Sequence, residues 1–151
     1  MSEALIRIVY DHLPPIEVKR HTETERGDIF TLVTPIDRWG IHIPAGFQSD
    51  GASVPRAFWG LVFPQDDLSS MYAAFFHDYL YRTHPKGWTR KDADEEFLFL
   101  LKLGDVPTAR ATMAYFGVRL FGAIAWNQGG KYKSLTDSVS GSARTQEGIK
   151  K

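Results

Sequence analysis

The spacing of apolar residues changes once along this chain, near residue 68, and this change restricts the fold more than any other feature of the sequence. Before it lie four short segments, rich in β-branched residues and separated by prolines or glycines, that predict strands. They are residues 4–10, 16–21, 28–34 and 39–43. After it lie three segments with helical spacing, residues 68–82, 91–103 and 107–126. Strands followed by helices are typical of an α+β domain, so we expect a small N-terminal antiparallel sheet packed on a three-helix C-terminal half.

The length of 151 residues suits a single domain with one core. We assign residues 1–126 to that α+β domain. Residues 127–151 are rich in Gly, Ser and Lys and hold few large apolar side chains. Such a segment cannot bury enough apolar surface to fold alone, so it predicts a tail that is either mobile or ordered by a partner.

Charge and cysteine content exclude several classes of protein. Lys and Arg total 18 and Asp and Glu also total 18, so no overall positive field favours nucleic acid, and we expect no nucleic-acid partner. The absence of cysteine excludes disulfides, a thiol nucleophile and a Cys-ligated zinc site, and it fits a reducing cytosol. The longest apolar runs are far shorter than the roughly 18 residues of a membrane span, so we expect no transmembrane segment.

The segment 73–81, AAFFHDYLY, carries the most chemistry. On a helix, His77 and Tyr81 lie on one stripe with Ala73, and Asp78 lies beside it. An imidazole, a carboxylate and a phenol could therefore converge. The alternative is that His77 and Tyr81 are core residues whose polar atoms are satisfied within the fold.

The next predicted helix has a carboxylate on its apolar stripe, which consists of Asp94, Phe97, Leu98 and Leu101. A carboxylate facing a core requires a donor or a cation, because leaving it unpaired costs several kcal/mol. The loop before this helix is short, so the two helices should pack antiparallel and bring His77 to Asp94. An aspartate that holds one imidazole nitrogen leaves the other as a base for water. Glu95 and Glu96 lie off the stripe and are expected in solvent.

A third candidate is Asp50, which Gly51 follows in the segment S-D-G-A-S. A carboxylate on a tight turn suits a hard cation. It equally suits a cap on a short helix, since Ser53 followed by Pro55 is an N-cap pattern. The sequence leaves both interpretations open.

Three motifs together resemble a known family. F-x-S-D-G-A-S-V-P, A-A-F-F-H-D-Y-L-Y and R-K-D-A-D-E-E-F, at residues 47–55, 73–81 and 90–97, closely resemble the domain of unknown function family 1353 of tailed bacteriophages and prophages. This resemblance implies a phage or prophage origin. It implies synthesis in the cytoplasm of a bacterial host, with assembly into the virion as one outcome. The tail would then contact other virion proteins.

The pair H-D-x-x-Y and A-D-x-x-F is more distantly similar to the phospholipase A2 superfamily, particularly its cysteine-free parvoviral form. This second resemblance implies that His77 is the general base for an attacking water, that Asp78 binds calcium, and that Asp94 orients His77 with support from Tyr81. The glycine-rich calcium loop of that superfamily is replaced here by S-D-G-A-S, in which Asp50 could supply the missing oxygen ligands.

Two functions therefore remain open. The first is a metal-dependent hydrolase of ester or phospholipid bonds, in which His77 activates water, calcium is the cation and no organic cofactor is needed. The second is a non-enzymatic virion, tail or assembly component, in which the H-D-x-x-Y and D-G-A-S-x-P motifs form a structural polar network.

Overall fold

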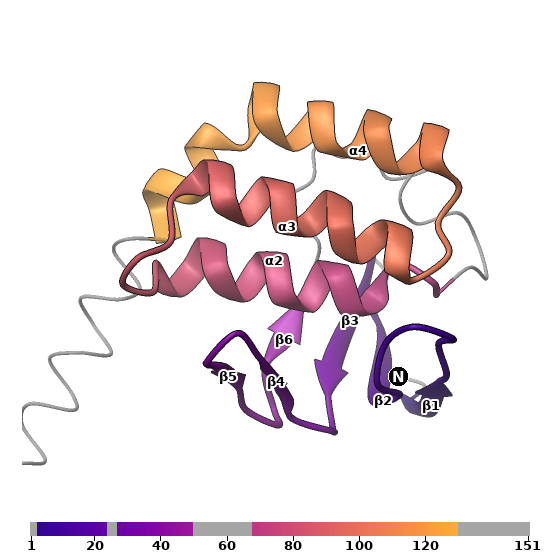
Figure 1. Cartoon of the computed structure of the whole chain (residues 1–151). Helices are drawn as coiled ribbons and strands as arrows, with labels where there is room; N and C mark the ends of the chain where they lie inside the picture. The colour runs from indigo at the N-terminus through magenta and orange to yellow at the C-terminus, as the bar shows by residue number, and fades with distance from the viewer. Residues whose placement is uncertain (1–2, 24–26, 50–67, 130–151) are drawn as a thin grey trace, which may run out of the picture.

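The computed structural model describes residues 3–23, 27–49 and 68–129, and within them it confirms the α+β class. An N-terminal antiparallel sheet is followed by helices (Figure 1). The strands are β1 (Glu3–Ile8), β2 (Ile16–Glu23), β3 (Gly27–Leu32), β4 (Ile36–Arg38), β5 (Ile41–Ile43) and β6 (Gln48–Ser49). The helices are α2 (Met71–Thr83), α3 (Arg90–Leu103) and α4 (Thr108–Phe121), and residues 123–129 form a further helical segment.

The main sheet has the order β1-β2-β3-β6, and every neighbouring pair is antiparallel. The short β6 was not expected, because two residues are too few to show an alternating pattern. The prediction of a single strand over 39–43 was wrong at its start. Trp39 and Gly40 form the turn between β4 and β5, with φ angles of 53° and 74°. Two consecutive positive φ angles suit the tight turn of a two-residue hairpin.

The predicted ends of α3 are confirmed. The Thr89 side chain accepts a hydrogen bond from the Asp92 amide while the Asp92 side chain accepts from the Thr89 amide, and Gly104 is the C-cap. The last predicted helix, residues 107–126, is instead interrupted at Gly122. A Cβ there would lie 2.6 Å from the Tyr81 hydroxyl oxygen, so this position approaches α2 too closely for a side chain. Residues 127–129, predicted to belong to the tail, are helical, and the rest of that tail lies outside the described residues.

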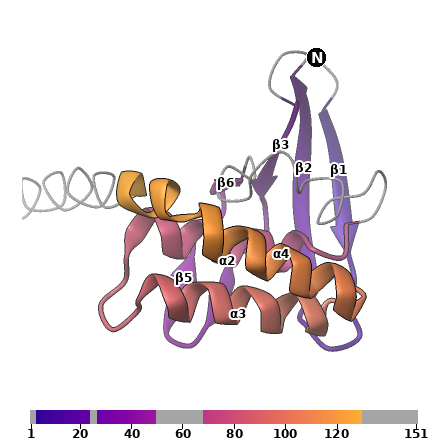
Figure 2. The same ribbon diagram turned by 90° about the horizontal axis from the view of Figure 1, so that it is seen from above.

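The three helices lie on the same side of the sheet and are stacked away from it (Figure 1), and Figure 2 shows them from above. Helix α2 lies nearest the strands, α3 packs against it, and α4 lies farthest from the sheet. The core fills the space between them, with Phe75, Phe76, Phe97 and Leu101 fully buried. Within the described residues, no helix combines the length and the apolar character that a membrane crossing requires.

Candidate functional site

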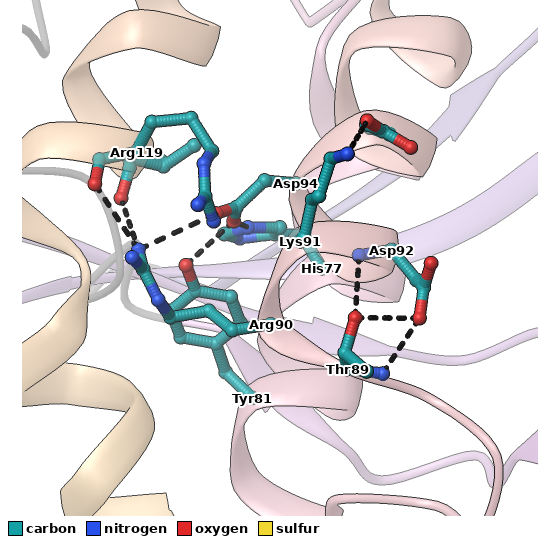
Figure 3. A network of polar contacts seen from close by, with 10 residues as sticks. His77, Tyr81, Thr89, Arg90, Lys91, Asp92, Asp94 and Arg119 are labelled. Carbon is teal, nitrogen blue, oxygen red and sulfur yellow. Dashed lines mark hydrogen bonds and ion pairs between the residues drawn. The ribbon is translucent and has the colours of Figure 1, made fainter.

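Asp94 is the centre of a buried polar network that joins α2, α3 and α4 (Figure 3). Its Oδ1 atom lies 2.8 Å from Nε2 of His77, and Tyr81 donates its hydroxyl hydrogen to the same oxygen at 2.5 Å. All three side chains are buried. The predicted pairing of Asp94 with His77 is therefore present, and Tyr81 lies where the second resemblance implied.

Two arginines complete the surroundings of Asp94. Arg119 of α4 donates to Oδ2 at 2.8 Å, and Arg90 lies 3.5 Å from the same atom, at the outer limit of a hydrogen bond. Arg90 also donates to the carbonyls of Val118 and Arg119, at 3.1 and 3.2 Å. These carbonyls belong to the last turn of α4, where a positive charge is favourable. The buried carboxylate thus has donors from three helices and two compensating cations.

Local sequence explains how these side chains meet. His77 and Tyr81 are four residues apart on α2 and share a face. The chain then leaves α2 through His84 in the left-handed conformation, and it turns again at Gly87, with φ of 88°. The capping box at Thr89 starts α3 immediately afterwards, so Asp94 falls early in α3, facing α2. The short loop and the cap together fix the register of the pair.

The network holds Asp94 ionised. Burial raises the pKa of this carboxyl group, but hydrogen bonds from His77, Tyr81 and Arg119 outweigh burial and leave the pKa below its ordinary value. Burial and the neighbouring Asp94 carboxylate raise the pKa of Tyr81 far above its ordinary value, so the phenol stays protonated and donates. An ionised carboxylate accepts only, so Nε2 of His77 carries the hydrogen. In the neutral ring, Nδ1 then holds the basic lone pair.

These pKa shifts predict acid sensitivity. Because the pKa of Asp94 is lower in the folded chain than the roughly 3.9 of an unfolded aspartate, its stabilising effect is complete above that value and is lost as pH falls through the folded pKa. We expect the free energy of unfolding, measured by urea denaturation, to fall as pH drops below about 5. The Asp94→Asn variant should show a shallower fall over the same range, whereas Glu95→Gln, an exposed acid on α3, should keep the wild-type slope. Equal slopes in all three chains would contradict this assignment.

Asp78 does not join the Asp94 network. Its carboxylate is buried and accepts a hydrogen bond from the Ser49 hydroxyl at the end of β6. The His77 ring instead packs between the rings of Tyr81 and Phe97, with centroid distances of 4.2 and 4.5 Å. His77 and Asp78, adjacent in sequence, thus serve two sides of α2: one faces α3 and the other faces the sheet.

No group of three or more His, Cys, Asp or Glu side chains gathers within residues 3–23, 27–49 and 68–129. Of the two predicted calcium ligands, Asp78 accepts a hydrogen bond from the Ser49 hydroxyl. Asp50, the other predicted ligand, lies outside the described residues, as does Ser53.

Three participants were not expected from the sequence. Arg119 and Arg90 hold Asp94, and Ser49 holds Asp78. Arg90 had a signal, because it lies four residues before a carboxylate predicted to be buried. Arg119 and Ser49 had none, since each comes from an element far away in the sequence.

The expectation that Glu96 lies in solvent was wrong. Its carboxylate accepts from Arg38 at 2.6 Å and from the Trp39 indole at 3.0 Å, which ties α3 to the β4–β5 hairpin. The helical stripe places Glu96 correctly off the core face, but the pattern of one helix carries no information about the hairpin that covers its flank.

Fold and site together define a small α+β domain whose three helices meet at the buried Asp94. The chain belongs to the family described as "Protein of unknown function (DUF1353)", which matches residues 28–118. It is also similar to a protein of Sinorhizobium fredii (strain NBRC 101917 / NGR234), named "Uncharacterized protein y4jT", with 30% identity over 80 residues. That match covers 53% of this chain and 23% of the relative. The relative is therefore much longer than this chain, and the similarity covers one region of it. No solved structure matches the chain significantly.

Proposed function

We propose that this chain is a hydrolase of carboxylic ester bonds, with phospholipids as the substrate class, in which His77 is the general base. One observation carries the proposal: Nε2 of His77 lies 2.8 Å from an ionised, buried carboxylate whose same oxygen is held by Tyr81. This arrangement fixes the tautomer and the orientation of the ring, which a general base requires. The similarity of H-D-x-x-Y and A-D-x-x-F to the phospholipase A2 helix pair supports the same roles.

In this mechanism, Nδ1 of His77 accepts a proton from a water molecule as the water oxygen attacks the ester carbonyl. The imidazolium that forms is stabilised by the Asp94 carboxylate through the Nε2 hydrogen. His77 then returns the proton to the departing alcohol oxygen as the ester bond breaks. Tyr81 touches neither water nor ester; it positions Asp94.

His77→Gln tests the base directly. Glutamine can still donate a hydrogen bond toward Asp94, but it cannot accept the proton of water at neutral pH. We expect hydrolysis of phospholipid vesicles and of a soluble aryl ester to fall about 10²- to 10⁴-fold. The matched control is His42→Gln, because His42 also contacts an aspartate, Asp37, at 2.6 Å, but on the exposed surface. Ester hydrolysis that is undetectable in the wild-type chain, or equal in both variants, would refute the proposal.

A divalent cation is a separate part of the proposal. Calcium would bind the Asp78 carboxylate together with Asp50, and no step of the mechanism above depends on it. Calorimetric titration with calcium, magnesium and zinc tests this part. We expect a calcium-specific signal in the wild-type chain that is lost in Asp78→Asn. If none of the three ions binds, the metal site is ruled out, and the ester assay alone tests the role of His77.

A non-enzymatic role in a phage particle is the second candidate, and one observation favours it. Arg119 and Arg90 already balance the charge of Asp94, so the network is complete as a structural link between helices. In this alternative the chain comes from a phage or prophage, and the segment 127–151 contacts another virion protein. This alternative predicts that mass spectrometry detects the chain in phage particles purified after prophage induction. It also predicts that the wild-type chain has no esterase activity and that His77→Gln lowers the free energy of unfolding.

A further inference from the structure

Helix α4 buries its small residues and exposes its large apolar residues, which is the reverse of what is usual for a helix at the surface of a monomeric domain. The side toward the protein carries small residues, which are Ala111, Ala114, Gly117 and Val118, all buried. The side toward solvent carries Met113, Phe116 and Leu120, with exposed fractions of 48, 56 and 72%. An amphipathic helix normally turns its large apolar side chains inward. The outer side of α4 therefore has the composition of a face that is covered in the functional state.

Ile124, just beyond the end of α4, extends this surface and is 72% exposed. We call Met113, Phe116, Leu120 and Ile124 the α4 patch. Met113, Phe116 and Leu120 are three and four residues apart, the spacing of side chains along one side of a helix that meets another helix, and Ile124 lies in the helical segment that follows the interruption at Gly122. Figures 1 and 2 show α4 on the outside of the helical layer, so neither α2 nor α3 covers this side.

The charges on α4 do not suit a membrane surface. Helices that lie on membranes carry lysines and arginines on the polar face, where these bind anionic lipid headgroups. Between Pro107 and Trp126 the charged residues are Arg110 and Arg119, and Arg119 is bound to the buried Asp94. The α4 patch itself is uncharged. Its chemistry matches another uncharged apolar helix face better than it matches lipid headgroups.

A second copy of the chain offers such a face. The formal net charge of zero means that two copies do not repel one another at long range. With roughly 200 Å² for each large side chain, the exposed fractions of the α4 patch correspond to about 500 Å² per copy. A pair would bury about 1,000 Å², the lower bound for a specific protein interface.

From these observations we propose that two copies of this chain associate through the α4 patch about a twofold axis. The same side of α4 then meets itself in the two copies, as a closed dimer requires.

Sedimentation velocity of the full chain over a range of concentrations tests the association. We expect the mass to rise from 17.1 kDa toward twice that value with concentration. Leu120→Arg and Phe116→Arg should keep the chain monomeric, and because both positions are exposed, the variants should fold. Leu5→Arg, at an equally exposed apolar position on β1, should dimerise like the wild type. A chain that is monomeric throughout, or a dimer that survives both α4 substitutions, would overturn the proposal.

Cross-linking tests whether the pair forms through α4, since the chain has no cysteine of its own. Ala109→Cys and Ala123→Cys each place one thiol at an exposed alanine near opposite ends of α4 and leave the α4 patch intact. After the two variants are mixed and treated with a short bis-maleimide, a pair formed through the α4 patch gives cross-linked dimers. The absence of the 109–109, 123–123 and 109–123 products alike would contradict the proposal. Monomers that bind vesicles of anionic phospholipid through Leu120 would assign the patch to lipid and overturn the proposal as well.

Discussion

Asp94→Asn should lower the free energy of unfolding by about 3–5 kcal/mol, the cost of removing one partner from a buried charge network. The substitution keeps the size of the side chain, so packing is little changed. It removes the charge that Arg119 and Arg90 compensate, and it places an amide hydrogen near donors. Urea denaturation monitored by tryptophan fluorescence measures the effect.

Glu95→Gln is the matched control, because it removes a carboxylate from the same helix at an exposed position, where Glu95 pairs with Lys91 at 3.6 Å. An exposed pair of this kind contributes at most about 1 kcal/mol. If Asp94→Asn cost no more than Glu95→Gln, the carboxylate would not organise the three helices. The result also bears on function. A stable Asp94→Asn chain that loses esterase activity would separate the orienting role of Asp94 from its structural role.

Gly129→Ala should detach the helical segment 123–129 from α2 and lower the free energy of unfolding by about 3 kcal/mol, the upper range for overpacking a buried position. A Cβ at Gly129 would lie 1.7 Å from the carbonyl oxygen of Tyr81, and backbone cannot move aside as a flexible side chain does. Trp126 in this segment stacks on the His84 ring, with a centroid distance of 3.8 Å, and also contacts the Tyr81 ring. Displacing the segment would break both contacts.

Hydrogen exchange of the segment 123–129 and the urea midpoint together measure this effect. Exchange should become faster across the segment in Gly129→Ala, while α3 keeps its protection. Gln128→Ala, at the exposed neighbouring position, should change neither quantity. Unchanged exchange in Gly129→Ala would show that the close approach of this segment to Tyr81 is not required.

Local patterns predicted the elements of this fold well where they were long. The capping box at Thr89 and the stripe containing Asp94 both lie within α3, and local rules suffice for them. Pairing of Asp94 with His77 also followed, because a short loop leaves two helices little choice but to lie antiparallel. Strands β4 and β6 were missed, since strands of two or three residues hold too little pattern to be recognised reliably.

Other contacts had no local signal. Arg119 reaches Asp94 from a helix that begins fourteen residues later, and Ser49 reaches Asp78 from the sheet. The helical pattern of residues 107–126 likewise does not tell which side of α4 faces the protein. Its small residues turn inward because α3 approaches closely, and this leaves the large residues outside.

The sequence by itself determined the α+β class, the start of α3, and the need of the core-facing Asp94 for a donor or a cation, because each depends on periodicity or on the cost of burying charge. The tertiary structure alone decided which cations balance Asp94, that Asp78 faces the sheet, and that α4 presents its large side chains outward. These depend on how elements distant in sequence approach one another, and packing in three dimensions sets that approach.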